Sequence, residues 1–60
     1  MNQKLIDRIH SFNITKDTER SIIKSFLSGC INQTMYSQIQ GETLDEKADT
    51  VINYLNDEIF

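Results

Sequence analysis

The side chains best suited to covalent chemistry are His10 and Cys30, the single histidine and the single cysteine of the chain. A catalytic thiol needs a neighbouring base or a position at the start of a helix to become a good nucleophile. Cys30 instead follows an expected helix end, and no glycine-rich loop that could hold a phosphate is present. The sequence therefore predicts a protein that is not an enzyme and binds no cofactor, with both side chains in packing roles.

Asp45 and Asp49 are the best candidates for metal ligands, because they lie one helical turn apart. Calcium takes about six or more oxygen ligands, and zinc sites use about four ligands. Neither the two carboxylates nor the pair His10 and Cys30 would complete such a site. We therefore expect no metal, and a solvated helix face at Asp45 and Asp49.

Residues 25–41 form a run of 17 residues without a charged side chain, in a chain that is 25% charged. The run separates two halves of opposite charge: residues 1–30 have a net charge of +2 and residues 31–60 a net charge of −5. Our first interpretation is that the two halves fold against each other and partly neutralise. The alternative is a charged face that meets a partner of opposite sign.

The spacing of the apolar residues predicts an all-α fold, a single domain over 1–60 with three to four helices at about 2–12, 16–28, 31–40 and 44–59. Leu5, Ile9 and Phe12 form the apolar stripe of the first helix. Thr15 is expected to cap the second helix, and Asp17 and Glu19 to lie in its first turn. On that helix, basic residues every four positions lie opposite the apolar residues Ile22, Ile23, Phe26 and Leu27.

Glycines and a capping box mark the expected ends of the helices. Gly29 and Gly41 are expected to end the second and third helices, Gly29 with a positive φ. Thr43 and Glu46 have the spacing of a capping box, in which each side chain accepts a hydrogen bond from a free backbone N–H. This start signal makes the fourth helix the clearest of the four, and its apolar face consists of Leu44, Ala48, Val51, Ile52, Leu55 and Ile59.

A protein contact is the first functional interpretation of the uncharged run. Few charges together with Met and Tyr are typical of an interface core, and a chain this short gains stability from a partner subunit. We expect a small non-catalytic regulator or inhibitor that binds a protein partner or a second copy of itself in a homodimer. The candidate contact residues are Phe26, Met35, Tyr36, Gln38 and Phe60. In a third interpretation, Ile31, Met35 and Ile39 only complete the core of the monomer.

A helix-turn-helix DNA-binding transcriptional regulator, using residues 16–40, is the alternative function. Helix 31–40 would present amides and hydroxyls to base edges, while the basic residues contact phosphates. The candidate nucleic-acid-binding residues are Lys16, Arg20, Lys24, Asn32, Gln33 and Tyr36. Phosphate contacts supply most of the affinity for DNA, however, and helix 31–40 has no Lys or Arg in a chain of net charge −3.

The expected location is cytoplasmic, without a membrane association. The N-terminus lacks the apolar segment of a signal peptide, and no apolar run approaches the roughly 18 residues of a membrane span. A single cysteine fits a reducing compartment.

Overall fold

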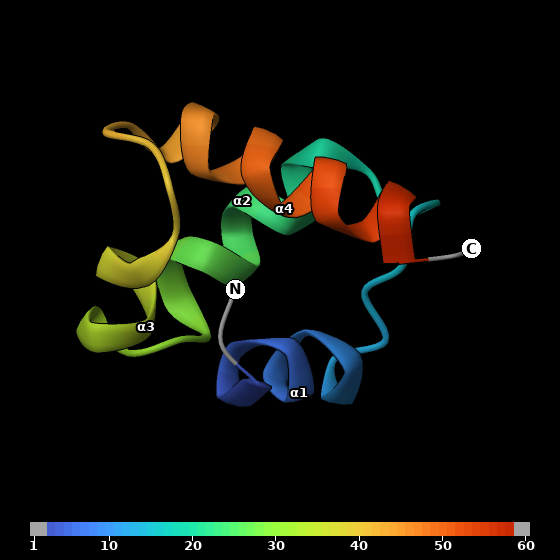
Figure 1. The fold of residues 1–60 in the computed structure, drawn as a ribbon, viewed down its shortest axis with the longest axis horizontal. Helices are drawn as coiled ribbons and strands as arrows, with labels where there is room; N and C mark the ends of the chain where they lie inside the picture. Colours follow the sequence, from blue (N-terminus) through green and yellow to red (C-terminus); the bar gives the residue numbers. More distant parts are fainter. Residues whose placement is uncertain (1–2, 59–60) are drawn as a thin grey trace.

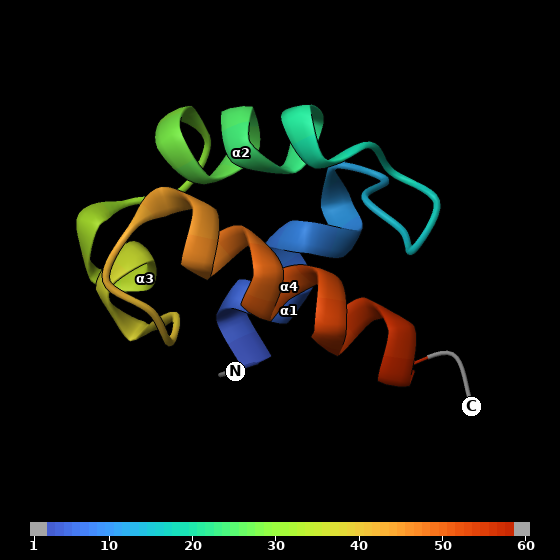
Figure 2. The same cartoon turned by 90° about the horizontal axis from the view of Figure 1, so that it is seen from above.

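The computed structural model describes residues 3–58, which form four helices and, within this range, no strand. These are α1 (Gln3–Ser11), α2 (Arg20–Gly29), α3 (Gln33–Gln38) and α4 (Leu44–Glu58). Figures 1 and 2 show that α1, α2 and α4 surround the centre of the molecule, while the short α3 lies at one end. The all-α bundle predicted from apolar spacing is confirmed.

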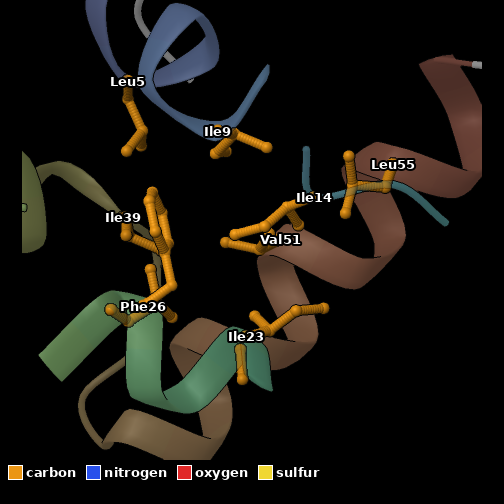
Figure 3. Close-up of a cluster of buried hydrophobic side chains, with 10 residues drawn as sticks. Leu5, Ile9, Ile14, Ile23, Phe26, Ile39, Val51 and Leu55 are labelled. Carbon is orange, nitrogen blue, oxygen red and sulfur yellow. The ribbon is translucent and has the colours of Figure 1, made fainter. Parts of the chain in front are cut away.

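The core is formed by side chains from all three long helices and from two connecting segments. Leu5 and Ile9 point from α1 toward Phe26 of α2, Val51 of α4 and Ile39 (Figure 3). The ten buried apolar side chains are Leu5, Ile9, Ile14, Ile23, Phe26, Leu27, Ile39, Ala48, Val51 and Leu55. Ile31 and Met35 pack against this cluster while only partly buried. The run 25–41 therefore does contribute to the core of the monomer.

The end of α1 differs from the prediction, because Asn13 turns the chain. Asn13 has a φ of 59°, a left-handed conformation that asparagine tolerates better than most residues. Its N–H donates to the carbonyl of His10 at 3.0 Å, and the N–H of Ile14 donates to that of Ile9 at 3.3 Å. This pair of bonds is a Schellman motif, which closes the helix and buries Ile14 beside Ile9. Phe12, which was expected on the apolar stripe, is 47% exposed as a result.

The second helix begins at Arg20 rather than at Lys16, so the predicted cap at Thr15 is wrong. The Thr15 N–H donates to the Thr18 hydroxyl at 2.8 Å, and the Asp17 N–H donates to the Thr15 hydroxyl at 3.2 Å. Threonine side chains thus satisfy the backbone of a turn and compete with a helix there. Lys16 and Asp17 lie in this turn, and the N-cap of α2 is Glu19, which makes no capping side-chain bond.

Both glycines have roles other than those predicted. Gly29 is the last residue of α2 and is not among the positive-φ residues, so its assignment as a left-handed cap is wrong. α3 spans only Gln33–Gln38, and its start is capped by the Asn32 side chain, which accepts from the N–H of Met35 at 2.8 Å. Gly41, with a φ of 125°, lies in the loop before α4. A Cβ at Gly41 would lie 2.9 Å from the Cβ of Glu46, so this loop passes close to α4.

The predicted capping box at the start of α4 is confirmed. The N–H of Glu46 donates to the Thr43 hydroxyl at 3.1 Å. The Glu46 carboxylate accepts from the N–H groups of Thr43 and Glu42 at 3.1 and 2.8 Å. These bonds hold the pKa of Glu46 below its usual value, since they stabilise the charged form.

Candidate interaction surface

A depression of about 250 Å³ lies between the end of α2, the linker 30–32 and α3. We call it the neutral groove, because every side chain that lines it is uncharged. Those residues are Leu27, Ser28, Ile31, Asn32, Gln33 and Tyr36. This volume is below the range of about 300–1,000 Å³ that is typical of small-molecule sites. The groove is instead large enough for one or two side chains of a partner protein.

Residues of α4 hold α3 in place against the body of the molecule. Lys47 is only 6% exposed, and its Nζ donates to the carbonyls of Ile39 at 2.7 Å and Tyr36 at 3.1 Å. The same ammonium lies 4.8 Å from the centre of the Tyr36 ring, within range of a cation–π interaction. One turn further on, the Thr50 hydroxyl donates to the carbonyl of Gln40 at 2.7 Å. The position of Tyr36 in the groove therefore depends on α4.

Lys47 supports the neutral groove, and the sequence did not predict this role. A single lysine in the acidic half of the chain is expected to be solvated, because lysine is rarely buried without a partner. Its position on the helix nevertheless carried a signal. Lys47 lies three residues after Leu44 and four before Val51, on the apolar side of α4. A buried ammonium there needs acceptors, and the end of α3 supplies carbonyls with partial negative charge.

The residues predicted for protein contact are spread over different environments. Phe26 is 3% exposed and packs edge-on against the Phe12 ring, with 5.3 Å between the ring centres. α2 turns this side chain into the core, so the single chain does not present it to a partner. Tyr36 is half-buried and lines the neutral groove. Met35 is half-buried too, but lines a second depression beside Lys4 and Arg8 of α1.

Two further predicted residues lie outside the neutral groove. Gln38, the last residue of α3, is exposed and does not line it. Phe60 lies outside the described residues.

The basic residues predicted to contact DNA do not form one free stripe. Lys16 lies in the turn before α2. Arg20 forms an ion pair with Asp49, and its guanidinium donates to the Asp45 carbonyl at 3.0 Å. Lys24 pairs with the Asp45 carboxylate at 2.7 Å. The first interpretation of the charge asymmetry is confirmed, since cations of α2 are neutralised by carboxylates of α4.

The ion pairs also shift the pKa values of their members. The hydrogen bond from Lys24 lowers the pKa of Asp45, and that from Arg20 lowers the pKa of Asp49. The same bond to Asp49 raises the pKa of Arg20. Asp45 and Asp49 remain exposed, as predicted, but their charges are engaged by α2 rather than only solvated.

The other predicted nucleic-acid contacts are divided between capping and the groove. The side-chain oxygen of Asn32 is used as the cap of α3. Gln33 is exposed at the mouth of the groove, and Tyr36 is half-buried in it. These amide and hydroxyl groups face a neutral surface rather than a basic one.

Two large apolar side chains are exposed outside the run 25–41. Phe12 is 47% exposed and Ile22 is 52% exposed. The Arg8 guanidinium lies over the Phe12 ring at 5.7 Å from its centre. The apolar periodicity places Phe12 and Ile22 on the core-facing stripes of their helices, so it does not predict that they are exposed.

His10 and Cys30 lie in different segments of the fold. His10 is exposed on α1 rather than packed at the core boundary, and Cys30 is partly buried after α2. Within residues 3–58, no three His, Cys, Asp or Glu side chains gather in a way that could hold a metal ion. No helix in the same range is long and apolar enough to cross a membrane.

Comparison of the chain with protein-family models, with curated proteins and with solved structures found no match.

Proposed function

We propose that this chain is a small, non-catalytic helical regulator or inhibitor that acts by protein–protein contact through the neutral groove. The observation that carries the proposal is the groove itself: a depression of about 250 Å³ that is lined only by uncharged side chains, in a chain that is 25% charged. Interface cores are depleted of charge in the same way. The partner is another protein, or a second copy of this chain.

The chemistry of the groove fits a protein side chain as its occupant. Leu27 and Ile31 provide apolar area, while Asn32 and Gln33 provide amide groups. Tyr36 combines a large ring with a hydroxyl that can pair at a wet edge, and tyrosines in such positions often dominate binding energy. Binding of an apolar or uncharged polar side chain in the groove would break no ion pair of this chain.

DNA binding by α2 and α3 is the second candidate. Its support is the arrangement of two helices joined by the residues 30–32, with Gln33 exposed at the start of the second helix. Its weakness is electrostatic. Arg20 and Lys24 are already paired with carboxylates of α4, and phosphate contacts must supply most of the affinity for DNA.

The test of the proposal adds one negative charge to the groove. Gln33→Glu places a carboxylate in the first turn of α3, where the helix dipole favours it, so the fold should be retained. The matched control is Asn53→Glu, on an exposed position of α4. In affinity capture, a protein retained by the native chain and by the control should be lost with Gln33→Glu and with Tyr36→Ala.

The same variants separate the two candidate functions when duplex DNA is added during sedimentation. A salt-sensitive DNA complex that survives Tyr36→Ala and is lost with Lys16→Glu would replace the proposal by the alternative. A set of bound proteins that is identical for the native chain, Gln33→Glu and Tyr36→Ala, in a chain that also ignores DNA, would contradict both.

A further inference from the structure

An exposed strip along the α1–α2 pair combines apolar side chains in its middle with charges at its ends. Its residues are Arg8, Phe12, Glu19 and Ile22, and we call it the α1–α2 strip. Phe12 packs on the Phe26 ring at 5.3 Å between centres, and Ile22 precedes Phe26 by one turn of α2. Side chains four residues apart on a helix are neighbours, so both exposed side chains lie beside the same buried ring.

The two charges lie at opposite ends of α2. Glu19 is the N-cap of the helix and is exposed. Arg8 reaches the other end, where its Nε donates to the carbonyl of Cys30 at 3.2 Å, just after the last residue of the helix. A helix of ten residues is about 15 Å long at 1.5 Å per residue. Along α2 the strip therefore runs from an acid, through apolar side chains, to a base.

We propose that the α1–α2 strip is the contact surface for a second copy of this chain, in a two-fold symmetric dimer. A two-fold axis that crosses the apolar middle at right angles to the strips places them antiparallel, so that Arg8 of each copy faces Glu19 of the other. The same surface then serves both copies, as an isologous interface requires. Phe12 and Ile22, exposed in the single chain, would bury each other across the axis.

This dimer uses a surface other than the neutral groove and goes beyond the proposed function. Ile22 and Ser28 are six residues apart on α2, so their side chains leave the helix about 120° apart. The groove, which Ser28 lines, therefore stays open when the strips meet. A dimer of this kind would also extend the thin core of a 60-residue chain.

Sedimentation at a series of concentrations measures the dimer directly. The native chain should dimerise, and Ile22→Ser should raise the dissociation constant at least tenfold. At concentrations too low for the native dimer, where association no longer adds stability, the two chains should melt at the same temperature. Arg8→Glu and Glu19→Arg should each weaken dimerisation, because each creates like charges across the axis. The matched charge reversals are Lys4→Glu on α1 and Glu42→Arg in the loop before α4, and neither should change the dissociation constant.

Mixing the two single variants gives the sharpest test. The Arg8→Glu chain carries acids at both ends of the strip and the Glu19→Arg chain carries bases, so the mixture should recover dimers that contain one chain of each kind. That recovery would show that the two ends of the strip meet charges of the other copy, and the weaker dimer of each single variant would show that the strips run antiparallel.

Failure of the dimer can be distinguished from failure of the proposed function. A chain that stays monomeric up to millimolar concentration, or a mixture that does not recover, overturns the α1–α2 dimer. A dimer broken by Tyr36→Ala but not by Ile22→Ser also overturns it, while supporting the neutral groove. Capture of another protein through Tyr36 by a monomeric chain would leave the proposed function intact.

Discussion

The two faces of the first half of α4 hold their neighbours by different physical means. Toward α2, Asp45 and Asp49 form ion pairs with Lys24 and Arg20 at the exposed surface. Toward α3 and the loop after it, Lys47 uses a buried ammonium to bind backbone carbonyls. Exposed ion pairs contribute little to stability, because water and salt screen them. A buried polar group that loses its partner is costly.

The difference separates what aligns the helices from what fixes the neutral groove. The α2–α4 pair rests on a shared apolar core, and its ion pairs only add a preference for one alignment. α3 has six residues, none of them fully buried, and so depends on hydrogen bonds from Asn32, Lys47 and its own turn. A short helix has little stability of its own in water.

The largest effects are expected from the core that both regions share. Leu55→Ala and Ile39→Ala, each at a side chain that is at most 3% exposed, should cost roughly 2–5 kcal/mol of unfolding free energy. Denaturant titration measures both. A value near zero for Ile39→Ala would show that the segment after α3 is not anchored in the core.

Lys47→Met should come next and should act locally. The substitution leaves the Ile39 carbonyl without its hydrogen bond, and a buried unsatisfied group costs about 1–3 kcal/mol. In hydrogen exchange, the amides of Tyr36 and Ile39 should lose more protection than that of Val51. The exposed Lys16→Met is the control, and an equal loss of protection throughout the chain would contradict a local role.

Thr43→Ala tests the capping box that begins α4. Loss of the bond from the Glu46 N–H to the Thr43 hydroxyl should cost about 1 kcal/mol. Glu46→Ala should cost less in the Thr43→Ala background than alone, because the two side chains form one motif. Strict additivity in the double-mutant cycle would show that the two sets of bonds act independently.

Acid should weaken the α4 contacts through three carboxylates. The pKa values of Asp45, Glu46 and Asp49 are lowered in the folded chain from ordinary values of 3.8, 4.5 and 3.8. The unfolded chain binds protons first as pH falls, so this stability is present above about pH 4.5 and is lost as pH falls through the lowered values. Thermal melts between pH 7 and pH 2 measure the loss. In Glu46→Gln the decline should be shallower.

The smallest effect is expected from Arg20→Gln, which removes the ion pair with Asp49. The melting temperature should fall slightly at low salt, and the difference from the native chain should vanish at about 1 M salt, where the Debye length is near 3 Å. Lys16→Gln, in the turn before α2, is the control. A large, salt-independent loss would mean that the ion pair, rather than the core, holds α2 on α4.

Local patterns in the sequence were sufficient to predict features that depend on residues close together in the chain, such as the apolar face of a helix or its cap. The apolar spacing located the four helices, and the Thr43–Glu46 pair marked the start of α4. The prediction failed at Thr15, because its hydroxyl can cap a helix or close a turn, and Thr18 made the turn the better choice. It failed again at Phe12, because Asn13 reversed the chain before the stripe was complete.

The candidate surfaces depended more strongly on contacts between distant residues. The sequence shows that residues 25–41 lack charge. It does not show that Phe26 and Ile39 turn inward while Tyr36 remains half-buried. Arg20 and Lys24 form a basic stripe in the sequence of α2. In the folded chain, carboxylates of α4 pair with both of them. Composition alone cannot distinguish a free charge from a paired one, since the partner lies more than twenty residues away.

Three properties could be predicted from the amino-acid sequence: the helical class, the capped start of α4 and the opposite charges of the two halves. They follow from residue types, from spacing and from neighbours within one helical turn. Contacts between distant segments were needed to bury Lys47 against the end of α3 and to leave Phe12 and Ile22 exposed. The physical reason is that burial and pairing are properties of surfaces brought together by folding. The same lysine or phenylalanine is compatible with either environment until its neighbours are fixed.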